Sequence, residues 1–347
     1  MKIANQKKIF FDFFSLKCLK FLIFLIVILG LIFFGFKLGS YSVYQKLSQD
    51  NVIPVRKQGD YKFINPLLEC DVQNNYLNNT YIPFEKKLKN SIADLNDKKY
   101  QNKEIAVYFR DLNNGPWFGI NPSANFTPAS LMKVPLMIAY YKQAESDPTI
   151  LQQKIVFQAD LETYPQNIVT GNKLIIGKEY TVEELIDFMI INSDNEAMAN
   201  LLNNFNQEKL DKVYLDLGII VPDLREPEDF MSISEYASFF RILYNAAYLN
   251  EYYSEKSLDL LSRTKFFDGL VAGVPFGVKV SHKFGERQNN ALKTANKQMH
   301  ECGIIYFPSH PYLLCVMTRG DDFEKMSNFI TDVSRLVYRT IFETYKY

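Results

Sequence analysis

The sequence is poor in the residues from which metal and redox sites are usually built. Its 347 residues include three histidines and four cysteines. No two cysteines are spaced as in a zinc site, and His282, His300 and His310 have no ligand partner at helical spacing, so we expect neither a metal nor an organic cofactor. Net charge is also absent, because Lys+Arg and Asp+Glu each number 39. Without a basic field, nucleic acid is not an expected partner.

Only one long apolar run is present, "FLIFLIVILGLIFFGF" at residues 21–36, followed directly by Lys37. We predict a transmembrane anchor over residues 21–37. Lysines outnumber acidic residues in the preceding segment, which predicts that residues 1–20 stay in the cytoplasm and the remainder faces the exterior of a cell membrane crossed once. The alternative is a signal peptide that is cleaved near Ser42.

Three cysteines would then face the exterior: Cys70, Cys302 and Cys315. An odd number cannot pair completely. Two interpretations stay open, a Cys70–Cys302 disulfide or three buried free thiols.

Composition divides the exterior part into a stalk and a domain. Residues 38–79 are polar and broken by proline and glycine, which indicates a juxtamembrane stalk. From residue 80 the patterns predict a helix, a hairpin of "IAVYFRDL" and "WFGI", helices over 128–144, 181–204 and 232–248, three strands near the end, and a last helix over about 322–345. Strands at both ends with helices between them predict an α+β domain over 80–347. We expect terminal helices packed on an antiparallel sheet, with an inserted helical lobe.

The stretch "FTPASLMKVPLM" places Ser130 and Lys133 three residues apart at a helix start. Positions i and i+3 share a helix face, so the lysine amine can reach the serine hydroxyl. A lysine whose pKa is lowered by desolvation can take the serine proton and activate it as a nucleophile. Because Pro135 cannot lie deep within a helix, we expect the helix to begin close to Ser130 or to kink.

Two further short motifs follow. "INSDNEA" places Ser193, Asp194 and Asn195 between two helical runs, where Ser-Asp-Asn could also be an ordinary turn or N-cap. "VKVSHKFGER" ends a predicted strand with Lys283, Phe284 and Gly285, and a strand lysine could equally be a device that protects a sheet edge.

Together, S-x-x-K, S-D-N and K-x-G resemble the motif set of the class A β-lactamases and penicillin-binding proteins. The hairpin that leads into the Ser130 helix, the helix before "SDN" and the strand-strand-helix ending are also similar to that superfamily. The resemblance covers about residues 80–347. It implies a β-lactamase-like fold for this domain and a serine hydrolase activity.

Carried over residue by residue, the resemblance implies that Ser130 is acylated and that Lys133 accepts its proton. Ser193 would pass a proton to the departing nitrogen, tuned by Lys283. Asn195 would hold the substrate amide, and Gly285 with Glu286 would border the substrate. The backbone N–H groups of Ser130 and Glu286 would form the oxyanion hole.

Two departures from the superfamily pattern concern the substrate. Phe284 stands where K-T-G or K-S-G motifs carry a hydroxyl that binds the substrate carboxylate. Class A enzymes also carry a deacylating Glu in an E-x-x-L-N loop. Here "LREPEDFMS" offers Glu226, followed by Asp229 and Phe230 in place of Leu and Asn. Glu226 is either a hydrolytic base or part of a solvated acidic turn.

Three functions remain from the sequence. The first is a membrane-anchored acyl hydrolase or acyltransferase whose acyl-Ser130 intermediate comes from a small-molecule, peptide or amide substrate. The hypothesis for this substrate is an amide or peptide of the cell wall. The second is a true class A-like β-lactamase. The third is a binding module that keeps the fold without turnover.

Overall fold

A computed structural model describes residues 61–65, 77–113, 116–159, 168, 171, 173–222, 229–288 and 297–345, with helical backbone also at Gly30 and Gly35. The predicted anchor therefore lies outside the described residues, except for these two glycines. None of the helices in the described ranges is long and apolar enough to cross a membrane. The description below concerns the unit formed by residues 57–66 and 73–347.

The domain is built on one five-stranded antiparallel sheet with the order β2-β1-β9-β8-β7. Its strands are β1 (Glu104–Asp111), β2 (Trp117–Ile120), β7 (Val280–Gln288), β8 (Lys297–Ile305) and β9 (Tyr312–Gly320). The predicted hairpin is confirmed, since Val107 pairs with Ile120. The first and last parts of the domain thus meet in the middle of the sheet, where β1 pairs with β9.

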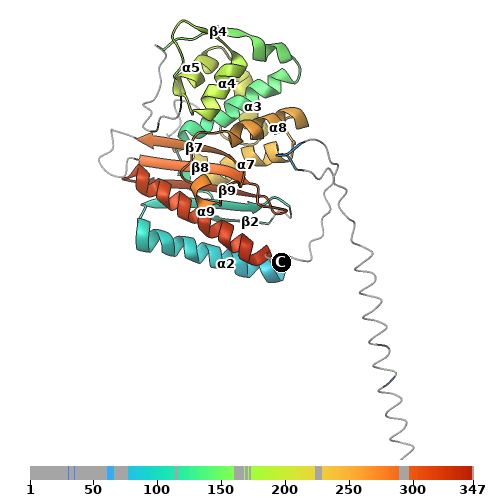
Figure 1. Cartoon of the computed structure of the whole chain (residues 1–347), viewed down its shortest axis with the longest axis vertical. Coiled ribbons are helices and arrows are strands. Elements are labelled where there is room, and N and C mark those ends of the chain that lie inside the picture. Colours follow the sequence, from blue (N-terminus) through green and yellow to red (C-terminus); the bar gives the residue numbers. More distant parts are fainter. Residues whose placement is uncertain are drawn as a thin grey trace, which may run out of the picture. The chain divides into compact units, whose positions relative to one another are not determined.

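Both faces of the sheet are buried. Side chains alternate between the two faces along each strand, and each face belongs to its own apolar cluster. In β9, Leu314 and Val316 belong to an apolar cluster with the last helix, whereas Leu313 and Met317 belong to a second cluster with the inserted helices. The terminal helices α2 (Leu77–Leu95) and α9 (Phe323–Tyr345) lie side by side over the first face (Figure 1). This arrangement confirms the predicted α+β architecture.

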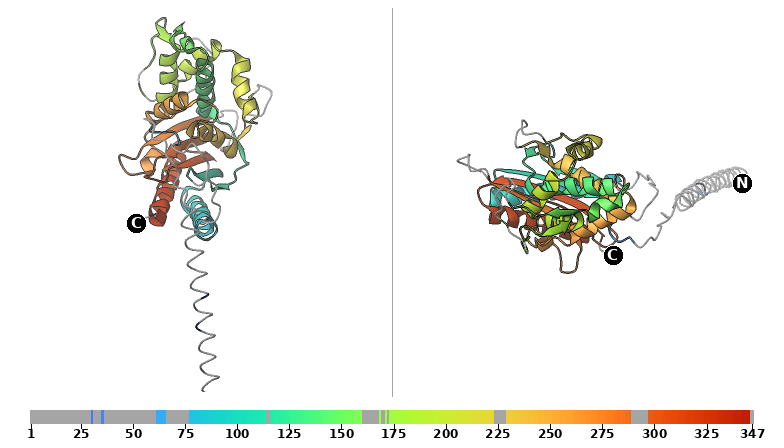
Figure 2. Two further views of the ribbon diagram at one scale, coloured as in Figure 1. Left: turned by 90° about the vertical axis from the view of Figure 1, so that its right-hand side faces the viewer. Right: turned by 90° about the horizontal axis from the view of Figure 1, so that it is seen from above.

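The inserted lobe is helical. Its helices over residues 182–203 lie at the opposite end of the domain from α2 and α9 in both side views (Figures 1 and 2), whereas its helix over residues 233–244 packs on the sheet. The helices of this lobe are α3 (Lys133–Ala144), α4 (Val182–Ile191), α5 (Asn195–Asn203), α6 (Gln207–Asp216), α7 (Ile233–Tyr244) and α8 (Glu251–Ser262). Two short ladders also occur, β3 (Asn125–Phe126) with β6 (Met231–Ser232), and β4 (Lys154–Val156) with β5 (Glu179–Thr181). The predicted helix over 181–204 is therefore two helices, with a break at Ser193.

Part of the predicted stalk contacts this domain. The backbone N–H groups of Phe63 and Ile64 donate to Glu255 in α8 at 2.8 and 3.0 Å. The Phe63 ring packs edge-on against Tyr306, whose hydroxyl donates to the Phe63 carbonyl. Residues 61–65 are thus held to the domain by both polar and apolar contacts.

The structure corrects the cysteine prediction. Cys302 in β8 is directly opposite Cys315 in β9, and a disulfide joins the two. Both predicted alternatives for Cys302 are therefore wrong, because it is neither paired with Cys70 nor a free thiol. Its partner is Cys315 on the neighbouring strand. Cys70 lies outside the described residues.

Candidate active site

Ser130 and Lys133 meet where a short 3-10 helix, η2 (Ala129–Met132), passes into α3. The α-helix proper begins at Lys133, so Pro135 is its third residue. The first four N–H groups of an α-helix have no partner within the helix, and the N–H that proline lacks is therefore not missed. The predicted start close to Ser130 is confirmed. The Lys133 Nζ lies 2.6 Å from the Ser130 Oγ.

Lys133 is fully buried and is surrounded by acceptors. Its Nζ contacts the Ser193 carbonyl oxygen at 2.8 Å and the Asn195 Oδ1 at 2.5 Å. A neutral amine has two hydrogens and one lone pair. Because these two oxygens can only accept, they take both hydrogens, and the lone pair remains for the hydroxyl of Ser130. The geometry is that of a base directed at a nucleophile.

The Ser193 turn lies between the end of α4 at Ile191 and the N-cap of α5 at Asp194. Asp194 caps α5 by accepting the Ala197 N–H. A capping box of Thr181 and Glu184 fixes the far end of α4. Between the helices Ser193 has a φ of 53°, in the left-handed region that costs an L-residue roughly 1–2 kcal/mol. Such strained positions persist where the surroundings over-determine them, and they cluster at functional sites.

Lys283 reaches the same turn from the edge strand β7. Its Nζ donates to the Ser193 Oγ at 2.8 Å and to the Phe284 carbonyl oxygen at 2.8 Å. The side chain is fully buried. A lysine that protects a sheet edge is exposed to water, so this alternative interpretation of the K-x-G motif is wrong.

Burial changes the proton affinity of both lysines. It lowers the pKa of Lys133 to about 7, against the opposing charges of Asp194 and Glu286. Burial, together with the charge of Lys133, also lowers the pKa of Lys283 well below its ordinary value. A base that has to accept a proton near neutral pH works best with a pKa in that range.

Gly285 brings strand β7 against the turn that carries Ser130. A Cβ at this position would lie 2.8 Å from the Pro128 carbonyl oxygen and 3.1 Å from the Leu131 nitrogen, so only glycine allows this approach. The next residue, Glu286, is half-buried. The backbones of Ser130 and Glu286, the predicted oxyanion hole, thus belong to two segments in van der Waals contact.

Phe284 faces the core instead of a substrate. Its ring is fully buried and stacks on Phe266 with 4.2 Å between centroids. The Lys283 Nζ lies 4.2 Å from the centroid of the same ring. The position that carries a substrate-binding hydroxyl in the resembling superfamily is therefore an apolar packing position here.

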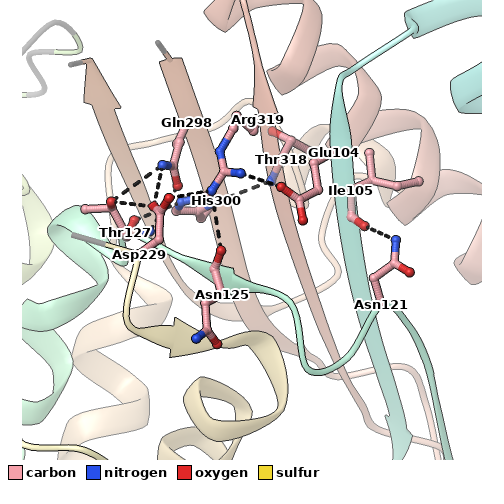
Figure 3. Close-up of polar contacts among 10 residues, drawn as sticks. All are labelled: Glu104, Ile105, Asn121, Asn125, Thr127, Asp229, Gln298, His300, Thr318 and Arg319. Atoms are coloured by element: carbon pink, nitrogen blue, oxygen red, sulfur yellow. Dashed lines mark hydrogen bonds and ion pairs between the residues drawn. The ribbon is translucent and has the colours of Figure 1, made fainter. Parts of the chain in front are cut away.

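Glu226 lies outside the described residues, which resume at Asp229. Asp229 belongs to a polar cluster that the sequence interpretation missed (Figure 3). Its Oδ2 accepts from Arg319 at 2.8 Å, and Arg319 also pairs with Glu104 of β1. These residues are far apart in the sequence, and no local motif marks them.

Comparison with known proteins identifies the family. The model of the family described as "Beta-lactamase enzyme family" matches residues 83–341, more than half of the chain. The chain therefore belongs to this family, and it is a serine hydrolase of the β-lactamase and penicillin-binding superfamily. Among curated proteins, none matches it.

Solved structures share the fold. PBP-A is 20% identical over 76% of this chain and 97% of its own, with a TM-score of 0.62. A point mutant of PBP-A, solved as an acyl-enzyme complex with penicillin G, is 22% identical over 74% and 97%, with a TM-score of 0.62. A β-lactamase from Sphaerobacter thermophilus is 22% identical over 75% and 97%, with a TM-score of 0.61. At these identities the likeness concerns the fold.

Proposed function

We propose that the protein is a membrane-anchored, extracytoplasmic hydrolase or acyltransferase that forms an acyl-Ser130 intermediate from an amide or peptide of the cell wall. The observation that carries the proposal is the buried Lys133 amine, 2.6 Å from the Ser130 hydroxyl and with a pKa of about 7. The proposed location outside the membrane rests on the apolar run at residues 21–36 and the lysines before it.

In the proposed acylation, the Ser130 Oγ attacks the substrate carbonyl carbon while its proton moves to the Lys133 Nζ. The carbonyl oxygen becomes negative between the N–H groups of Ser130 and Glu286. The carbon–nitrogen bond then breaks, and the Ser193 hydroxyl gives its proton to the leaving nitrogen. Lys133, which took the Ser130 proton and lies 3.4 Å from the Ser193 Oγ, replaces that proton, while Lys283 holds the same oxygen at 2.8 Å. Each of these steps is carried out by the chain's own side chains and backbone.

The fate of the acyl group separates an acyltransferase from a β-lactamase. Water can release the acyl group only with a base to activate it, and the candidate for this base is Glu226. The β-lactamase alternative is favoured by the family match over residues 83–341. The acyltransferase is favoured by Phe284, because the core position of its ring removes the hydroxyl that recognises a β-lactam carboxylate.

Intact-mass spectrometry of the full-length protein distinguishes these functions. The protein is followed over time with a penicillin and with a serine-reactive phosphonate, beside Ser130→Ala and, as a matched control, Ser146→Ala at an exposed serine. We expect an adduct that Ser130→Ala abolishes and Ser146→Ala retains.

Each pattern of adducts has one meaning. A penicillin adduct that persists supports the acyltransferase, whereas one that forms and decays supports the β-lactamase. A phosphonate adduct alone indicates an active serine with a different acyl donor. No adduct with either reagent overturns the proposal in favour of a binding module.

A further inference from the structure

All three polar groups of Thr127, three residues before the nucleophile, are held by side chains from other segments. The Thr127 N–H donates to the Gln298 Oε1 at 3.0 Å, and its carbonyl oxygen lies 3.0 Å from the His300 Nε2. Its hydroxyl donates to the Asp229 Oδ1 at 2.8 Å. Figure 3 shows these side chains converging on Thr127. We call Asp229, Gln298 and His300 the Thr127 clamp.

Gln298 and His300 are two residues apart on β8, so both side chains leave the same face of the sheet. One offers an acceptor and the other a donor, as the backbone of a paired strand would. Thr127 is thus fixed as in a sheet, although the described ladder beside it, β3 with β6, ends at Phe126.

The role of His300 follows from its second nitrogen. The Nδ1 accepts the Thr318 N–H at 3.3 Å, so it carries no hydrogen, and the Nε2–H is free to donate to the Thr127 carbonyl. Only this neutral tautomer satisfies both contacts. The ring is fully buried and lies edge-on to Phe126 at 5.5 Å between centroids. Burial lowers the pKa of His300 to about 4, in agreement with a neutral ring.

The acidic member of the clamp is itself anchored to the sheet. The Asp229 Oδ1 accepts the Gln298 Nε2 at 2.8 Å, and its Oδ2 accepts from Arg319 on β9 at 2.8 Å. Arg319 also pairs with Glu104 on β1. Three sheet strands, β1, β8 and β9, therefore contribute side chains that fix Thr127 directly or through Asp229.

Thr127 is followed by a turn that an L-residue does not adopt freely. Ala129 has a φ of 52°, and the Leu131 N–H closes the turn on the Pro128 carbonyl at 3.0 Å. A left-handed alanine costs roughly 1–2 kcal/mol, so contacts on both sides have to maintain it. Gly285 presses on the turn from β7, and the clamp holds the chain that enters it.

We propose that Asp229, Gln298 and His300 are positioning residues for Ser130. They fix Thr127, and thereby keep the Ser130 hydroxyl at the Lys133 amine and the Ser130 N–H beside β7. This inference rests on the proposed acylation of Ser130. The clamp residues act only through Thr127 and do not touch the acyl group.

The test compares His300→Phe, which keeps a ring but removes both polar contacts, with His300→Gln, whose amide can still donate to Thr127. The matched control is His310→Phe. His310 lies in the loop between β8 and β9, and its ring stacks on Tyr345 of α9. Two quantities are measured on full-length protein whose melting curve shows that it is folded. These are the rate of phosphonate labelling at Ser130 and the deuterium exchange of the amides of residues 127–133.

We expect His300→Phe to slow labelling by about 10- to 100-fold, because a displacement of about 1 Å at a reacting group costs this much. The pH midpoint of labelling, set by Lys133, should not move, and amide exchange at 127–133 should rise about tenfold or more relative to α9. His300→Gln should recover part of both losses, and His310→Phe should change neither.

Unchanged labelling in His300→Phe, or a loss that only follows the unfolded fraction, would overturn the inference. A wild type that neither a penicillin nor a phosphonate labels would instead refute the proposed function. In that case amide exchange still tests the Thr127 clamp. Unchanged exchange at residues 127–133 in His300→Phe would contradict the clamp.

Discussion

The pH dependence of Ser130 acylation tests whether Lys133 is the base. With a pKa of about 7, Lys133 is neutral in only about 1% of molecules at pH 5 and about 9% at pH 6, but in about 90% at pH 8. If the neutral amine takes the Ser130 proton, the labelling rate follows these fractions. A lysine with an ordinary pKa of 10.5 would instead be neutral in about 0.03% of molecules at pH 7.

The perturbation is Asp194→Asn. The negative charge of Asp194 raises the pKa of Lys133, so its removal should lower this pKa and move the labelling midpoint below pH 7. Labelling at pH 6 should therefore rise, at most about elevenfold, since the neutral fraction can grow only from about 9% to 100%. Asparagine is as good an N-cap as aspartate, so α5 should keep its start.

The assay follows phosphonate labelling between pH 5 and 9 in reactions that are quenched at set times and analysed by mass spectrometry. Asp147→Asn is the matched control, because Asp147 is also an N-cap but is exposed and caps a different helix, η3 (Pro148–Gln152). Its profile should coincide with that of the wild type. A midpoint that stays in place or rises in Asp194→Asn, or a labelling rate independent of pH, would refute Lys133 as the base.

Three further predictions concern stability and packing. Lys133→Met should raise the free energy of unfolding in urea at pH 7, by at most about 5 kcal/mol, because the pKa of Lys133 is about 7 in the folded state and 10.5 in the unfolded state. The gain should shrink toward pH 10, where Lys133 is neutral in the folded state and the free energy of deprotonating it in the unfolded state has become small. The wild type should lose about 3 kcal/mol of unfolding free energy as the pH falls from 6.5 to 4, because burial lowers the folded-state pKa of His300 to about 4. His300→Gln should remove this loss. Equal pH slopes in variant and wild type would contradict either prediction. Gly285→Ala should slow labelling by about tenfold or more through the 2.8 Å approach to Pro128. Gly320→Ala should not, because its Cβ would lie 3.3 Å from the flexible Met326 and 3.5 Å from the Asn102 Oδ1.

Local patterns predicted the parts of the site that depend on neighbours in the chain. Ser130 and Lys133 are three residues apart on one helical segment. Ser193, Asp194 and Asn195 are consecutive at the break between two helices. The antiparallel sheet and its flanking terminal helices followed from the order of apolar periods. The Ser130–Lys133 contact is short-range, so sequence spacing is a sufficient guide to it. The sheet was predicted only as an architecture, because the pairing of β1 with β9 joins segments about 200 residues apart.

The missed features depend on register between strands. Strand β8 begins at Lys297, and four of its first five residues are polar or charged, so no apolar pattern marks its start. The register of β8 with β9 places Cys302 opposite Cys315 and Gln298 opposite Arg319. Neither the disulfide nor the Thr127 clamp can be derived without this register, because a shift of one residue would exchange the two faces.

The two buried lysines argue against a module that only binds. Each is fully buried, Lys133 lowers the pKa of Lys283, and both point at the Ser193 hydroxyl, from 3.4 and 2.8 Å. Burying amines in this way lowers stability by several kcal/mol at neutral pH, and apolar residues of similar volume would avoid that loss. A chain that kept the fold for binding alone would gain stability from such replacements without losing function. Two destabilising amines that meet at the Ser193 hydroxyl, one of them also 2.6 Å from the Ser130 hydroxyl, are the arrangement that proton transfer requires.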